Sequence, residues 1–199
     1  MIELSFPTRG MSDTFTPTKL RLTVAQYHRM GEAGIFAPDA RLELIEGEVI
    51  EMPPIGPPHA VLVTRLTRFL VTAVGDAAVV WVQLPVVLDN FSEPQPDVAL
   101  LDKSVDTLPG RLPTVDDALL VIEVSDTTLS YDRGRKLSLY ARHGVREVWI
   151  VDIRSRVVEV YRDPVNDAYR LDRRAGASET LSPVALPGVE VSLAALFAS

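Results

Sequence analysis

The sequence predicts an α/β fold, a mixed central β-sheet flanked by α-helices. Apolar runs at Ala118–Val124 and Val145–Val151 enclose a helical pattern over Tyr131–His143, with short links between them. A strand, a helix and a second strand in this order are typical of a βαβ crossover. His59–Val74 adds a helix, because its apolar residues recur on one helical stripe. Further β-rich runs on both sides of these elements supply the remaining strands.

The N-terminal half contains a short helix and several strands before the crossover. Thr23 has the character of an N-cap for a helix that continues to Met30. Arg41–Met52 alternates apolar and polar residues around Gly47, which predicts two strands joined by a tight turn, or one bulged strand. Ala77–Leu88 is a β-rich run that we expect to bend near its proline.

The C-terminal part continues the sheet. Val157–Arg162 alternates in the manner of a strand, and we expect it to form an antiparallel hairpin with Val145–Ile153. Ala168–Leu171 and Glu179–Leu181 are candidate short strands. Ser192–Phe197 fits a last amphipathic turn of helix.

Length and composition indicate a globular protein. Its 199 residues include 47% apolar and 24% charged residues, which fits one domain with a substantial core. We interpret residues 1–22 as an N-terminal arm and residues 23–199 as a single domain. The sequence contains no apolar run of about 18 residues and no signal-peptide core, so we expect a cytoplasmic protein without membrane contact. The absence of cysteine excludes disulfides and thiolate metal sites.

The formal net charge is −7. This charge argues against a protein that coats nucleic acid, because contacts between basic side chains and phosphates dominate the affinity of proteins for nucleic acid. The charge does not exclude an enzyme that acts on nucleic acid, since acids at a metal site contribute to the total. Five basic residues lie close together in the sequence and are candidates for a local basic face: Arg133, Arg135, Lys136, Arg142 and Arg146.

Two acids lie on apolar strands and are candidates for a functional site, although Asp97 alone also fits a strand cap after Pro96. Glu123 lies between Ile122 and Val124, and a buried carboxylate is costly unless it is paired or binds a metal. Asp97 opens a second apolar strand, Asp97–Leu101, directly after a proline. Because ligands often bind near strand ends in α/β sheets, both acids are candidates for one site.

The following helix carries a possible partner for these acids. Asp132, Lys136 and Tyr140 recur at every fourth position and therefore lie on one stripe of the helix. Lys136 on this stripe could reach back to Glu123. Each residue alone also fits a structural role, Lys136 as a solvated lysine and Tyr140 as a core residue. The order and strand context of the acids and the lysine together favour a functional site.

The order Asp97, Glu123, Lys136 resembles the PD-(D/E)XK nuclease superfamily, and more closely its Uma-type "putative restriction endonuclease" family. The resemblance spans about Thr23 to Arg162 and implies a restriction-endonuclease-like fold. One position departs from the simplest superfamily pattern: Ser125 stands two residues after Glu123, where lysine is expected, and Lys136 matches the family's lysine instead. Four passages carry the resemblance: Arg41-Leu42-Glu43-Leu44-Ile45-Glu46-Gly47-Glu48, His59 at a helix start, Pro96-Asp97-Val98, and Ile122-Glu123-Val124-Ser125 through Asp132, Lys136, Tyr140, Gly144-Val145 and Glu147-Val148-Trp149-Ile150-Val151-Asp152.

The resemblance implies a Mg²⁺-dependent DNA endonuclease, with Mn²⁺ as a possible substitute. Asp97, Glu123 and the backbone carbonyl of Val124 would bind the metal, because hard ions prefer oxygen ligands. Lys136 would orient the attacking water, help to deprotonate it, or offset charge on the phosphate. Three further site residues complete the set: Glu43 as an additional catalytic acid, and His59 and Tyr140 as substrate-binding residues.

Two alternatives stay open at this point, since a fold does not fix a function. One is a catalytically silent relative that serves as a DNA-associated or oligomeric module. The other is a metal-dependent hydrolase of a different substrate, which a closed pocket rather than a wide groove would favour. We also expect a homodimer, by analogy, because two-fold symmetry suits the cutting of both strands of DNA.

Overall fold

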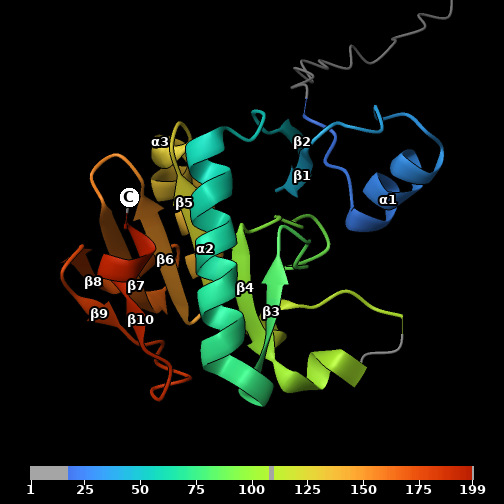
Figure 1. The fold of residues 1–199 in the computed structure, drawn as a ribbon. Helices are drawn as coiled ribbons and strands as arrows, with labels where there is room; N and C mark the ends of the chain where they lie inside the picture. Colours follow the sequence, from blue (N-terminus) through green and yellow to red (C-terminus); the bar gives the residue numbers. More distant parts are fainter. Residues whose placement is uncertain (1–17, 108–109, 199) are drawn as a thin grey trace, which may run out of the picture.

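The computed structural model describes residues 18–107 and 110–198, and its centre is a six-stranded mixed sheet (Figure 1). The strand order is β3-β4-β5-β6-β7-β8, and every neighbouring pair is antiparallel except β5 and β6, which are parallel. The predicted α/β class is confirmed. The strands are β3 Ala78–Val82, β4 Val98–Asp102, β5 Ala118–Ser125, β6 Glu147–Asp152, β7 Val157–Val165 and β8 Ala168–Gly176.

The parallel pair is joined by the predicted crossover. It consists of α3 (Leu129–Tyr131), a π-helical turn (Asp132–Lys136) and α4 (Leu137–Arg142). Gly144 follows with a φ of +77°, the left-handed conformation that ends many helices. The sequence predicted one continuous helix here. The wider π-helical turn is a difference, and such turns are frequent at functional sites.

The central strands β4, β5 and β6 are buried on both faces because helices cover the sheet from both sides. On one side, α2 (Pro57–Val74) lies across the sheet (Figure 1) and buries the apolar stripe seen in its sequence. On the other side, α4 packs against the alternate residues of the same strands. The first core combines Leu62, Val63, Leu66, Leu70 and Val74 with Val98, Leu100, Leu120, Ile122 and Val124; the second combines Leu139 and Tyr140 with Ala99, Leu101, Val121, Val148 and Ile150.

The N-terminal part forms a helix and a hairpin beside the sheet. α1 (Val24–Glu32) begins at Thr23, whose side chain and Gln26 form a capping box. β1 (Leu42–Ile45) and β2 (Glu48–Glu51) pair antiparallel, so the two-strand alternative for this segment is confirmed. The hairpin is tied to the main body where the backbone of Leu44 exchanges hydrogen bonds with the backbone of Glu93 (N–O distances 2.7 and 3.4 Å). This connection places β1 near the start of β4.

The turn of this hairpin depends on glycine. Glu46 and Gly47 both have positive φ, +55° and +81°, as a two-residue hairpin turn requires. A Cβ atom at Gly47 would lie 2.6 Å from the Cβ and 2.9 Å from the Cα of Arg21. The backbone N–H of Leu22 donates to the Gly47 carbonyl, so residues 18–22 run along this turn. The rest of the predicted arm, 1–17, lies outside the described residues.

We therefore expect Gly47→Ala to lower the free energy of unfolding by about 2–3 kcal/mol, from backbone strain and a close contact together. Gly144→Ala is the matched control, because it has a similar positive φ but open space around the added methyl group. It should cost only about 1 kcal/mol, the strain alone. Urea unfolding of the two variants measures the difference, and equal losses would contradict a contact at Gly47.

The remaining segments differ from the predictions mainly in length. The β-rich run Ala77–Leu88 forms a strand only as far as Val82, since Gln83 has a φ of +49° and turns the chain. β8 is longer than the predicted Ala168–Leu171. The C-terminal elements are β9 (Thr180–Leu181), β10 (Val191–Ser192) and α5 (Leu193–Leu196), and short 3-10 turns lie at Gly75–Ala77, Lys103–Thr107 and Val115–Asp117. Within the described ranges, no helix is long and apolar enough to cross a membrane.

Candidate active site

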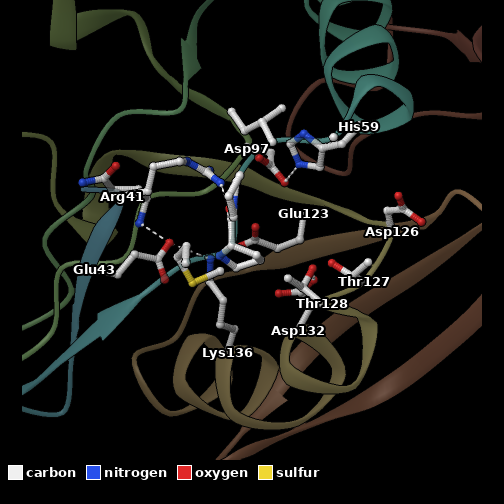
Figure 2. A pocket seen from close by; sticks show the side chains of 16 residues that line it. Arg41, Glu43, His59, Asp97, Glu123, Asp126, Thr127, Thr128, Asp132 and Lys136 are labelled. Atoms are coloured by element: carbon white, nitrogen blue, oxygen red, sulfur yellow. Dashed lines mark hydrogen bonds and ion pairs between the residues drawn. The ribbon is translucent and has the colours of Figure 1, made fainter. Parts of the chain in front are cut away.

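Side chains from four separate elements meet in one pocket of about 110 Å³. Glu43 comes from β1, Asp97 from the residue before β4, Glu123 from β5 and Lys136 from the π-helical turn. Figure 2 shows Lys136 rising from the crossover between Glu43 and Glu123, with Asp97 and His59 beyond them. The register explains part of this meeting, because Val98 pairs with Ile122 and brings their neighbours Asp97 and Glu123 to the same region of the sheet.

Lys136 is the buried cation of the site. Its ammonium nitrogen lies 2.7 Å from Glu123 Oε1 and 3.0 Å from Glu43 Oε1. Burial by itself lowers the pKa of Lys136, but the Glu123 and Glu43 carboxylates outweigh it and hold this pKa well above the usual value. Lys136 therefore carries a positive charge at neutral pH and has no lone pair with which to accept a proton.

Glu123 is buried and shares one oxygen between two donors. The Tyr140 hydroxyl donates to Glu123 Oε1 at 2.6 Å, beside the ammonium of Lys136. Burial raises the pKa of Glu123 above its usual range, with further contributions from the Asp132, Asp97 and Glu43 charges, and Lys136 opposes the rise. Tyr140 does not line the pocket; it contacts Glu123 from the core side.

Asp97 is held in its ionised form by three donors. Asp97 Oδ2 lies 3.0 Å from His59 Nε2 and accepts the backbone N–H of Val124 at 2.9 Å. The side-chain amide of Gln83 donates to Oδ1 at 3.3 Å. Burial raises the pKa of Asp97, but His59 and the Val124 N–H lower it by more, so the pKa lies below its usual value.

Two buried polar atoms at the pocket lack a hydrogen-bond partner within the described residues: Glu43 Oε2 and His59 Nδ1. The other oxygen of Glu43 accepts from the Gln95 backbone N–H at 3.0 Å and from Lys136. Because unpaired buried polar atoms are costly, these two atoms are the places where the site has bonding capacity left for a ligand.

A polar loop after β5 forms one wall of the pocket. Asp132 Oδ2 accepts the hydroxyls of Ser125 (2.7 Å) and Thr128 (2.6 Å), which ties the π-helical turn to the strand end. The sequence placed Asp132 on the stripe of Lys136 but assigned it no role. Gln83 and Gln95 were also missed. Gln95 directly precedes the Pro96-Asp97 pair and could have been noted for that reason, whereas nothing in the sequence marks Gln83.

A second ion pair anchors the π-helical turn to the sheet. Arg133 makes two hydrogen bonds of 2.8 Å to Glu159 of β7, and Tyr161 donates to the same carboxylate at 2.9 Å. Burial raises the pKa of Glu159, but these donors and the arginine charges lower it by more, so it lies below the usual 4.5.

We therefore expect Glu159→Gln to lower stability near neutral pH by about 1 kcal/mol, because Arg133 is partly exposed and screened by solvent. A carboxylate whose pKa is lowered by folding stabilises the folded state above its unfolded pKa, and this stabilisation is lost as the pH falls. The difference between variant and wild type should therefore shrink as the pH falls below 4.5 and through the lowered pKa of Glu159. Urea unfolding across pH tests this, and a pH-independent difference would contradict it.

A mixed sheet with acids on adjacent strands and a lysine on the crossover between parallel strands defines a nuclease-like α/β protein. The chain belongs to the Uma2 family, whose description is "Putative restriction endonuclease" and whose family profile matches residues 24–195. The resemblance seen in the sequence is thus confirmed at the level of the family.

A solved structure has a similar fold. It is a "putative nuclease belonging to DUF820" from Anabaena variabilis ATCC 29413, with a TM-score of 0.67, 16% sequence identity, and coverage of 88% of this chain and 97% of that chain. At this identity the similarity supports the fold alone. No curated protein matches the chain.

Proposed function

We propose that this protein is a divalent-metal-dependent endonuclease that hydrolyses phosphodiester bonds in DNA. The observation that carries the proposal is the meeting of Glu43, Asp97 and Glu123 with the buried Lys136 in one pocket. Family membership supports a nuclease. The DNA substrate and the metal dependence are our inference from the chemistry of these side chains.

The residues of the pocket fit a hard divalent cation. Five carboxylates line the pocket (Glu43, Asp97, Glu123, Asp126 and Asp132) against two permanent cations, Arg41 and Lys136. Such a pocket repels a phosphate until a cation balances it. The free oxygen of Glu43 and the carboxylates of Asp97 and Glu123 are donors of the type that Mg²⁺ and Mn²⁺ prefer.

We assign Asp97, Glu123 and the Val124 carbonyl as the groups that would hold this metal, with Glu43 as an additional acid beside them. Among the residues that the structure describes, no three His, Asp or Glu side chains already form a metal cluster. Lys136 lies between two of the acids and His59 contacts the third. When bound, Mg²⁺ would activate a water molecule and offset charge on the phosphate.

Lys136 and His59 are the groups of this chain that would act on the phosphate. Since Lys136 stays protonated, it donates hydrogen bonds to the attacking water or the phosphate and offsets negative charge, and it does not act as a base. His59 contacts Asp97 through Nε2, and its Nδ1, which has no partner among the described residues, is the atom left to contact the substrate. Tyr140 holds Glu123 in place, a position that suits orientation of Glu123 better than contact with substrate.

Purified protein incubated with supercoiled plasmid tests the proposal. We expect nicking with Mg²⁺ or Mn²⁺, none with EDTA, and none with Asp97→Ala. Asp106→Asn, which removes an exposed acid that does not line the pocket, should cut like wild type. Absence of cleavage together with absence of metal binding by calorimetry would favour the silent module and overturn the proposal.

A hydrolase of another substrate is the second candidate, because the carboxylates lie in a small recess. Cleavage of the small diester bis(p-nitrophenyl) phosphate, without any cleavage of DNA, would favour it. The single domain over 23–199, the homodimer and the cytoplasmic location remain predictions. Light scattering of the purified protein tests the dimer.

A further inference from the structure

The acids of the site lie in a recess that a single strand enters more readily than a duplex. The side chains of Lys136, Glu123 and Asp97 are 1%, 5% and 11% exposed. One wall of the pocket is the segment Met52–Gly56 and the other is Asp126–Thr128. A phosphate in a duplex stays on the outside of a rigid cylinder, which makes its approach to buried acids between these two segments harder. A single strand can bend into the recess.

A groove lies beside this pocket, between α2 and β3. Its volume is about 460 Å³, within the range of roughly 300–1,000 Å³ typical of small-ligand pockets. The acid pocket is smaller than that range and has room for little beyond a phosphate group and an ion. The groove has an apolar floor and a polar border, formed by Ile55, Val63 and Val82 and by Thr64, Arg68 and Gln83 respectively.

The groove adjoins the acid pocket. Ile55 lines both. Gln83, at the near end of the groove, donates its side-chain amide to Asp97 Oδ1 at 3.3 Å. Gln83 also holds the positive φ of +49° that ends β3, a conformation that is strained for this residue type and persists where the surroundings require it. The strained residue thus lines the groove and contacts an acid of the neighbouring pocket.

Arg68 gives the groove a positive charge that other residues do not neutralise. In the part of the chain that the structure describes, its guanidinium has no hydrogen-bond or ion-pair partner. Arg133, Arg135 and Arg142, in contrast, all pair with carboxylates. A free guanidinium at the border of an apolar groove suits a phosphate with an attached base, because Arg binds phosphate through paired donors.

We propose that this groove binds an unpaired nucleotide next to the scissile bond, so that the substrate is a single strand or an unpaired end. The base lies on the floor of Ile55, Val63 and Val82, and Arg68 contacts a flanking phosphate. This inference rests on the proposed nuclease function, since it places the neighbouring phosphodiester in the acid pocket.

Single-turnover cleavage with Mn²⁺, on a labelled single-stranded oligonucleotide and on the blunt duplex of the same sequence, tests the inference. We expect the single strand to be cut at least about tenfold faster at subsaturating enzyme. Arg68→Ala should raise the half-saturating enzyme concentration for the single strand about tenfold, through a lost phosphate contact, with little change in the maximal rate. Thr64→Trp, which fills the groove from an exposed helix position, should have the same effect.

Two controls lie on the same helix outside the groove. Arg65→Ala removes an arginine that donates to the Ala198 carbonyl, and Val61→Trp adds bulk at another exposed position. Both should bind and cut like wild type. Cutting of the duplex as fast as the single strand, or groove variants that match the controls, would overturn the inference while leaving the nuclease function intact.

If neither oligonucleotide is cut, the proposed function fails, and the binding of the single strand is then the test of the groove. Fluorescence anisotropy of the labelled single strand then decides. Weaker binding by Arg68→Ala than by Arg65→Ala would support the groove as a strand-binding site, and equal binding would overturn it.

Discussion

Glu123→Gln is expected to lower the rate of phosphodiester cleavage by about a thousandfold while the protein stays folded. A metal at the site is worth several kcal/mol to the transition state, and each 1.36 kcal/mol is about tenfold in rate. Glutamine keeps the shape of the side chain and its contact with Tyr140 but removes the negative charge that would hold the metal. Because burial already raises the pKa of Glu123, loss of its charge relieves a cost to the folded state and compensates for the weaker pairing of Lys136.

The measurement is the single-turnover rate on the best substrate, beside calorimetry with Mn²⁺ and urea unfolding. We expect rate and metal affinity to fall together and the unfolding midpoint to stay near that of wild type. Glu51→Gln, an exposed acid at the end of β2, serves as the control. If Glu123→Gln bound metal as tightly as wild type, Glu123 would not be a metal ligand.

Lys136→Met is expected to have the largest effect on stability, a loss of about 3–5 kcal/mol in EDTA. The reason is that Glu43 and Glu123 would lose the one cation that lies between them while remaining buried. Methionine fills a similar volume, so the loss reports charge and not a cavity. Urea unfolding measures it, with Lys103→Met as a control at an exposed lysine that should change stability by less than about 0.5 kcal/mol.

A double-mutant cycle makes the cause testable. Glu123→Gln in the Lys136→Met background should restore part of the lost stability, because one of the two unpaired carboxylates is gone. Saturating Mn²⁺ should restore part of it as well, since the ion supplies the missing positive charge. Additive losses in the double variant would show that the destabilisation does not arise from the buried carboxylate.

The central elements could be predicted because they are local. Each of these elements has its own signal in the sequence. The continuous apolar run at Ala118–Val124 indicates a strand buried on both faces. Helical periodicity marks α2, and a glycine at position 47 suits the positive φ of the turn. The role of Gln83 could not be predicted. β3 ends at Gln83, whose backbone N–H donates to the carbonyl of Asp97, directly before β4, and this contact is not local in sequence.

The candidate site was predictable in part for a similar reason. The order of two acids on strands and a lysine on the following helix predicted Asp97, Glu123 and Lys136 as candidates. The structure brings all three to one pocket. The basic residues near Lys136 could not be placed in this way. Lys136 is buried, whereas Arg133 pairs with Glu159 and Arg142 with Glu46, so these three do not contribute unpaired charges to an exposed basic face.

The sequence by itself determined the class of fold, the family and the three main candidate residues, because hydrophobic periodicity and residue order are properties of the chain alone. Only the tertiary structure decided that Glu43 shares Lys136 with Glu123. It also decided that Tyr140 lies behind the site and that a groove beside α2 adjoins the pocket. These facts depend on the packing of a hairpin, a helix and a sheet that are distant in sequence, and no local pattern of residues encodes the distances between them.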